Sequence, residues 1–162
     1  MTMNTGKILV AQSQGIYIIK FVGDVRLNLC GTLDQYTDEM FESEKFKTVI
    51  IDLTETQCID STSLGQLAKI SILYKEKYGQ LPTIISTQDD INRILLSMGF
   101  DQVFYIVHEL VSQVEYLDEL PLKSVDEDEM KKRVLEAHKL LMNMNDNNRE
   151  AFQDLVNSLE DK

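Results

Sequence analysis

The chain is poor in several residue types that mark particular classes of protein. Its 162 residues include no tryptophan and only two prolines, two cysteines and two histidines. Cys30 and Cys58 lack a Cys-x-x-Cys spacing, and His108 and His138 are isolated in the sequence. A metal site or a thiol redox centre therefore has little support, and we expect no cofactor. Both cysteines are expected to be small apolar residues of the core.

Basic residues and long apolar runs are also scarce. The 27 acids outnumber the 16 lysines and arginines, which gives a formal net charge of −11. Nucleic acids and anionic membranes are bound chiefly through basic side chains, so neither is expected as a direct partner. No apolar run approaches the roughly 20 residues that cross a bilayer. Residues 1–14 lack the basic and apolar regions of a signal peptide, so we expect a cytoplasmic protein.

Two short runs rich in β-branched and aromatic residues open the chain, at residues 7–11 and 16–22. A turn signal that ends in Gly15 lies between them and predicts an antiparallel hairpin. Gly23-Asp24 is expected to end the second strand, although an extended stretch can continue over residues 26–29. Residues 46–53 contain a largely apolar run at residues 48–53, which suits a central strand of the same sheet.

Helices and strands are then expected to alternate. Helical spacing of apolar residues, or a strand-like run, predicts these elements: helices over residues 32–41, 61–78, 90–98 and 109–117, and strands over 82–86 and 103–106. Thr87 followed by Asp90 resembles a capping box that would open the third helix. The order predicts an α/β fold with a mixed sheet, in which helical crossovers join the later strands.

Pro121 marks a boundary in composition. Residues 124–162 contain no glycine and no β-rich run, and two stretches of helical spacing are separated at residues 143–148. We therefore predict one domain over residues 1–120 and an α-helical hairpin extension over residues 121–162. Its apolar faces must be buried against the domain, against each other or against a second chain, which leaves a homodimer open.

The polar run at residues 60–63 is the strongest candidate for a functional site. Asp60, Ser61, Thr62 and Ser63 lie between the central strand and the second helix, and each is a good N-cap residue. A cap needs only one of them. A hydrolase that used Ser61 would need a base and an orienting acid, which the sequence does not supply nearby. Asp52 at the end of a central strand could resemble the phosphoacceptor of a response-regulator receiver. That chemistry needs an acidic pair after the first strand and a lysine near the last strand, and the sequence supplies neither.

The run Ile59-Asp60-Ser61-Thr62-Ser63-Leu64-Gly65, together with the preceding strand and the Gly23-Asp24 hairpin end, resembles the signature of STAS-domain anti-sigma factor antagonists. The resemblance covers residues 7–117. Two positions depart from the family pattern: Ser63 replaces a glycine, and Gly23-Asp24-Val25-Arg26 replaces Gly-Glu-Leu-Asp. The helical tail resembles that of longer gammaproteobacterial members.

The resemblance implies a binding protein and not an enzyme. Ser61 would be phosphorylated by a serine kinase and dephosphorylated by a PP2C-type phosphatase, with Thr62 and Ser63 as weaker candidates. The unphosphorylated protein would bind an anti-sigma factor, and the phosphorylated protein would release it. The residues expected to bind this partner are at the exposed start of the second helix and beside it: Asp24, Asp60, Thr62, Ser63, Leu64 and Gly65. The alternative is a constitutive STAS scaffold in a signalling complex.

Overall fold

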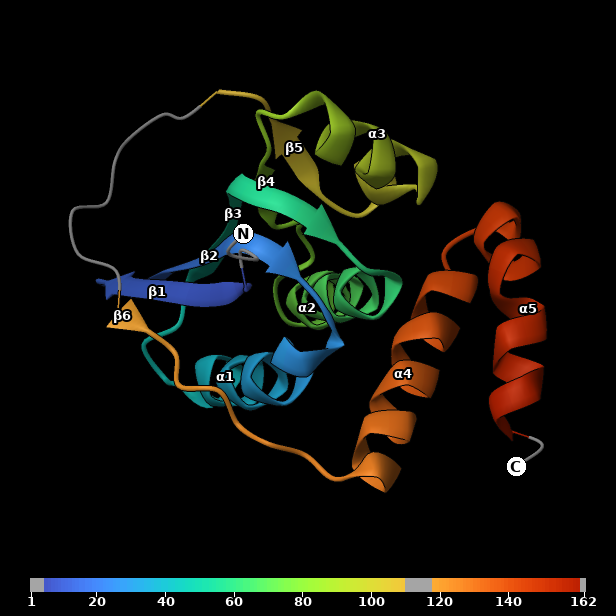
Figure 1. Cartoon of the computed structure of the whole chain (residues 1–162). Helices are drawn as coiled ribbons and strands as arrows, with labels where there is room; N and C mark the ends of the chain where they lie inside the picture. The colour runs from blue at the N-terminus through green and yellow to red at the C-terminus, as the bar shows by residue number, and fades with distance from the viewer. Residues whose placement is uncertain (1–4, 110–117, 161–162) are drawn as a thin grey trace.

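The computed structural model describes residues 5–109 and 118–160 (Figure 1). Its strands are β1 (Lys7–Ser13), β2 (Ile16–Val25), β3 (Thr48–Ile59), β4 (Thr83–Ile85), β5 (Tyr105–Val107) and β6 (Asp118–Glu119). Its α-helices are α1 (Cys30–Glu42), α2 (Ser61–Tyr78), α3 (Asp89–Ser97), α4 (Glu127–Met142) and α5 (Asp146–Glu160). Two short 3-10 helices span Leu27–Leu29 and Phe100–Gln102.

The strands of the described residues form one mixed sheet in the order β5-β4-β3-β2-β1-β6. β1 pairs antiparallel with β2 and β6, whereas the pairs from β2 to β5 are parallel. Parallel neighbours need a crossover, and α1, α2 and α3 supply the three crossovers in turn. The predicted mixed α/β fold is confirmed. The sequence did not predict β6, because two residues are too few to show an alternating pattern.

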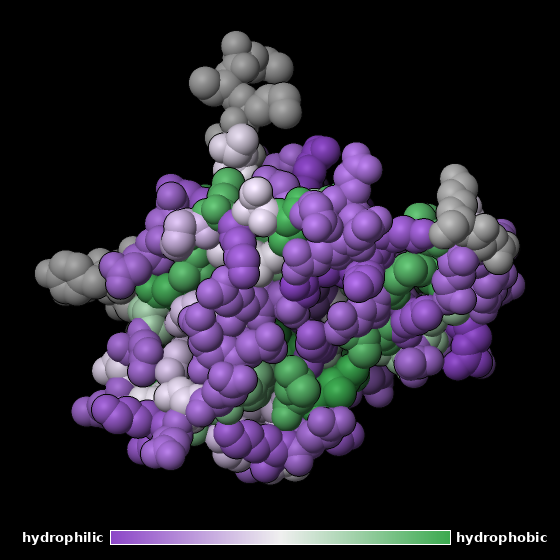
Figure 2. All heavy atoms as spheres, turned by 90° about the horizontal axis from the view of Figure 1, so that it is seen from below, coloured by the Kyte–Doolittle hydropathy of each residue, from purple (hydrophilic) through white to green (hydrophobic). Residues whose placement is uncertain are grey.

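One face of the sheet carries the core. Alternate residues of β2 and β3 are completely buried there, among them Ile19, Phe21, Val49 and Ile51. In Figure 1, α1 and α2 lie on one side of the sheet, α4 lies beside α2, and α5 lies outside α4. Figure 2 shows that side as mostly hydrophilic, with hydrophobic side chains in separate patches. The acidic composition is therefore displayed on the surface while the apolar residues fill the interior.

The strands leading to the site are longer than the sequence predicted. β2 does not end at Gly23-Asp24 but continues to Val25, because its pairing with β3 resumes after a register shift beside Gly23, which adopts φ 81°. β3 does not end at Leu53 but continues through polar residues to Ile59, which pairs with Val25. The hydroxyl of Thr56 in this stretch donates to the Phe21 carbonyl at 2.8 Å. Pairing with β2 thus extends β3 through a polar stretch that lies beyond the apolar run.

Two predictions concern the start of α3 and a helix after β5. The capping box at Thr87 is wrong: the N-cap of α3 is Gln88, and its side chain makes no capping bond. Asp89 and Asp90 stabilise the first turn of α3 through the helix dipole instead. The helix predicted over residues 109–117 lies outside the described residues from 110 onward.

The predicted C-terminal helices are present as α4 and α5. The side chain of Asp126 caps α4 by accepting from the Glu129 N–H at 2.8 Å. The apolar face of α4 packs against α2 of the domain as well as against α5, and Leu141 is completely buried there. A domain boundary at residue 120 stays a prediction. Within the described ranges, no helix is both long and apolar enough to cross a membrane.

The β1–β2 turn yields the first testable prediction. Gln14 and Gly15 have φ 54° and 84°, as a two-residue hairpin turn requires. A Cβ on Gly15 would lie 2.2 Å from the Lys45 carbonyl oxygen, whereas Gly79, at φ 69°, has no atom near its Cβ position. Gly79→Ala should therefore lower the unfolding free energy by about 1–2 kcal/mol, the cost of the left-handed conformation. Gly15→Ala should lower it further, because Lys45 must also move. Urea unfolding of both variants measures the difference, and equal losses would contradict it.

Candidate functional site

The carboxylate of Asp60 positions the start of α2. Asp60 is extended, with φ −84° and ψ 168°, and its Oδ1 accepts from the Ser63 N–H at 2.8 Å. Its Oδ2 accepts from the Leu27 N–H at 2.7 Å. Its own N–H donates to the Val25 carbonyl at 3.0 Å. One side chain thus joins the end of β3, the first turn of α2 and the segment that follows β2.

Ser61, the first residue of α2, is hydrogen-bonded to a histidine of α4. Its Oγ lies 2.7 Å from Nε2 of His138, whose Nδ1 lies 2.6 Å from the Val134 carbonyl oxygen. A carbonyl can only accept, so Nδ1 carries the proton and donates to Val134. In the neutral ring Nε2 is then the acceptor, and the Ser61 hydroxyl donates to it. His138 is only 2% exposed and contacts the Phe152 ring edge-to-face, with 4.9 Å between centroids.

The start of α2 is not exposed as the sequence analysis expected. Thr62, Ser63, Leu64 and Gly65 are all buried. A Cβ on Gly65 would lie 2.4 Å from the Ala137 carbonyl oxygen of α4. The backbones of α2 and α4 therefore approach closely at the one position of this turn that has no side chain. Ser61 itself is half-buried.

Asp24 lies at the neighbouring end of β2. Its Oδ1 accepts from the Cys58 thiol at 2.6 Å, and its Oδ2 accepts from Arg26 Nε at 2.6 Å. The thiol hydrogen bond, followed by Arg26, lowers the pKa of Asp24. The same bond raises the pKa of Cys58, because the thiolate would lose it and face a carboxylate. Cys58 is exposed, so the expectation that both cysteines are core residues is wrong for Cys58 and confirmed for Cys30.

Charged side chains join α1, α2 and α4 next to this site. Lys69 of α2 contacts Asp34 of α1 and Glu136 of α4, both at 2.9 Å. Arg133 of α4 also pairs with Asp34. Burial alone would lower the pKa of Lys69, but the two carboxylates outweigh it and raise that pKa. The cavity that these residues border measures about 10 Å³, which is about the space of one water molecule. The helices therefore fit tightly.

The family follows from a comparison with known proteins. The STAS domain model matches residues 7–119. The chain belongs to the STAS-domain family. Among solved structures, this STAS domain resembles an anti-sigma factor antagonist from Mycobacterium paratuberculosis, with a TM-score of 0.54 and 19% identity over 65% of this chain and 88% of that chain. At that identity the likeness shows the fold. No curated protein matches the sequence.

His138 is the residue of the site that sequence reasoning missed. It lies 77 positions from Ser61 and belongs to the part of the chain after the family match. The available signal was a histidine on the apolar stripe of a helix, between Val134 and Leu141. Its contact with Ser61 supplies the base that a serine nucleophile would need. A carbonyl and not a carboxylate orients the ring, and the cavity between α2 and α4 is far below ligand size. The geometry therefore favours a contact between helices over a catalytic pair.

The two hydrogen bonds of Asp60 yield the second prediction. Asp60→Ala should lower the unfolding free energy by about 2 kcal/mol or more, because it removes the cap of α2 and the bond to Leu27. Asp126→Ala is the matched control: it removes a single capping bond and should cost about 1 kcal/mol. Asp60→Asn should recover part of the loss, since its amide oxygen can still accept from Ser63. Chemical unfolding measures all three, and equal losses in the two alanine variants would refute the double role.

Proposed function

We propose that this protein is an anti-sigma factor antagonist whose binding to an anti-sigma factor is controlled by phosphorylation of Ser61. The observation that carries the proposal is the position of Ser61, which directly follows the Asp60 cap as the first residue of α2. This is the position at which the family signature has its phosphoacceptor. Membership of the STAS family and the fold shared with an anti-sigma factor antagonist support the same role. The protein then acts by binding and not by catalysis.

The start of α2 would tolerate a phosphate on Ser61, whereas an interface pressed on it would not. It adds about −1.5 to −2 charges. The positive end of the α2 dipole stabilises such a charge by about 0.3–1 kcal/mol. A partner pressed against the same turn would meet that charge beside the Asp60 carboxylate, where like-charge contact and desolvation cost several kcal/mol. Each 1.4 kcal/mol is about tenfold in affinity, so phosphorylation would release the partner without unfolding the domain.

The docking face in this proposal is the start of α2 with the adjacent end of β2. Its members are Asp24 and Asp60, which are half-buried, and Thr62, Ser63, Leu64 and Gly65, which are buried in this structure. A serine kinase and a PP2C-type phosphatase would act on Ser61. Ser63 in place of a glycine and the Gly23–Arg26 sequence alter this face relative to the family pattern, and they would select the particular anti-sigma factor.

The alternative function is a constitutive scaffold. The observation that favours it is the hydrogen bond between the Ser61 hydroxyl and His138, which keeps that hydroxyl engaged in the structure described here. A STAS domain in this state would assemble a complex without any phosphorylation. The C-terminal helices would then contribute to assembly, including a homodimer.

Pull-downs with purified anti-sigma factors test the switch. Ser61→Ala should retain the captured anti-sigma factor, whereas Ser61→Asp should weaken its binding about tenfold or more, because it places a charge where the phosphate would be. Ser158→Ala and Ser158→Asp are the matched controls. Ser158 is exposed on α5, so these substitutions make the same changes in charge away from the docking face. Equal binding of the anti-sigma factor by the two Ser61 variants would refute control by phosphorylation of Ser61.

Intact-mass analysis of protein from cells separates the switch from the scaffold. Phosphorylation adds about 80 Da and introduces the charges discussed above. The heavier species should disappear in Ser61→Ala and persist in Ser158→Ala. Its absence under all growth conditions tested would favour the scaffold.

A further inference from the structure

Helix α4 covers the part of α2 that the proposed function assigns to the anti-sigma factor. Ala137 packs on Gly65 so closely that a Cβ there would overlap its backbone. One residue further, Nε2 of His138 lies 2.7 Å from the Ser61 hydroxyl oxygen. Both hairpin residues are 2% exposed. The phosphoacceptor and the glycine of the signature are therefore in contact with this chain's own hairpin.

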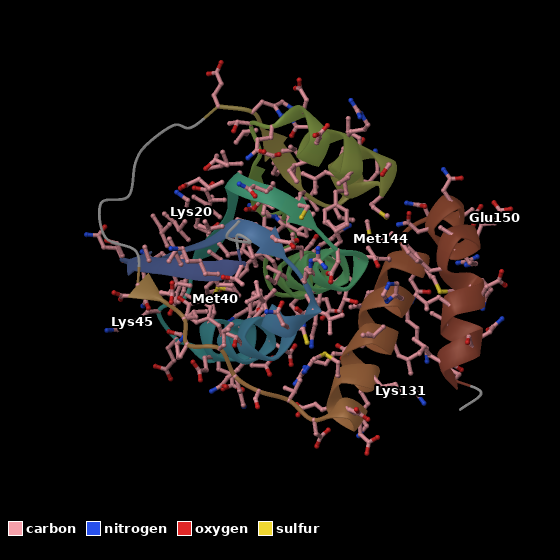
Figure 3. All side chains as sticks on the ribbon, in the orientation of Figure 1. Lys20, Met40, Lys45, Lys131, Met144 and Glu150 are labelled. Carbon is pink, nitrogen blue, oxygen red and sulfur yellow. The ribbon has the colours of Figure 1, made fainter. Side chains whose placement is uncertain are left out.

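The hairpin is attached to the domain on both sides of this contact. Toward the start of α4, Met130 Sδ lies 3.7 Å from the Cys30 thiol. Toward its end, the side-chain amides of Asn145 and Asn148 donate to the Met98 carbonyl at 3.3 and 2.9 Å. Met144, labelled in Figure 3 near the α4–α5 turn, packs on the core. The covered surface thus extends along α4 and past its end.

We propose that the α4–α5 hairpin is a displaceable cap on the docking face, so that the anti-sigma factor binds only after the hairpin leaves α2. This inference rests on the proposed function, because it takes the α2 start as the docking face. The cap and the partner cannot occupy Gly65 together, since no space remains between Gly65 and Ala137. The measured affinity is then the intrinsic affinity reduced by the fraction of open molecules.

The connection to the domain allows the hairpin to leave without detaching. The segment between β6 and α4 is held to α1 through the Thr32 hydroxyl, which donates to the Pro121 carbonyl at 3.1 Å and accepts from the Lys123 N–H at 2.8 Å. These bonds lie before α4 and do not involve α2.

A native thiol reports whether the cap opens. Cys30 is 1% exposed and lies against Met130 of α4, whereas Cys58 is exposed and its thiol donates to Asp24 of β2. In full-length Ala137→Leu, the added bulk between α2 and α4 should raise the rate of Cys30 alkylation by N-ethylmaleimide about tenfold or more. Cys58 should react at an unchanged rate. Ala151→Leu, the same substitution at an exposed position of α5, should change neither rate.

His138→Ala provides a second opening variant that adds no bulk. It removes the hydrogen bond to Ser61 and should also accelerate Cys30 alkylation. Hydrogen exchange in β2, whose Ile19 and Phe21 are completely buried, checks that the sheet remains folded in each variant. If Ala137→Leu and His138→Ala both remain folded and Cys30 is alkylated at an unchanged rate in both, the proposal that the hairpin is a displaceable cap is overturned.

The binding measurement uses the anti-sigma factor captured by Ser61→Ala. Ala137→Leu should bind it about tenfold more tightly than the wild-type chain, because the open fraction rises, and Ala151→Leu should not. Faster alkylation of Cys30 with unchanged affinity would overturn the gating role while leaving the proposed function intact. Failure of every variant, including Ala137→Leu, to bind any anti-sigma factor would instead overturn the proposed function, and gating with it.

Discussion

The carboxylate of Asp60 is the constraint on which the site depends. It accepts from the Ser63 N–H and from the Leu27 N–H, so it fixes the first turn of α2 relative to the segment after β2. The C-terminal ends of the two parallel strands β2 and β3 are thereby tied to one helix start. Because Ser61 follows Asp60 directly, these bonds fix the backbone of Ser61, and the contact with His138 holds its hydroxyl. The capping residue and the proposed phosphoacceptor are neighbours here, so the cap fixes the backbone from which the Ser61 hydroxyl extends.

The close approach of α2 and α4 is the second constraint, and it depends on a single missing side chain. Gly65 leaves room for the Ala137 backbone, and this brings His138 within hydrogen-bond distance of Ser61. The ion pairs of Asp34 with Lys69 and Arg133 lie beside this contact on largely buried side chains, where the cost of desolvation offsets much of the attraction between the charges. Tight packing at the centre thus determines where the hairpin lies, and the charges around it fix orientation more than they add stability.

The sequence predicted the elements that carry strong local signals. The range of α2 was predicted correctly, because the capping residues before it and Gly79 after it, at φ 69°, mark both ends. The outer half of β3 was missed, since only its pairing with β2 makes that polar stretch a strand. The role of His138 was missed for a related reason: its meaning comes from a partner 77 positions away. Local chemistry predicts caps and turns, whereas contacts between distant segments need the fold.

Ser63 shows how burial changes the interpretation of a sequence difference. Read from the sequence alone, a serine in place of the family's glycine adds a side chain to an exposed docking face. In the structure Ser63 is 3% exposed, and its N–H is already bonded to Asp60. Its side chain therefore contributes first to packing within this chain. If the hairpin is a cap, Ser63 contacts a partner only in the open form, so one residue would influence both the stability of the closed form and the choice of partner.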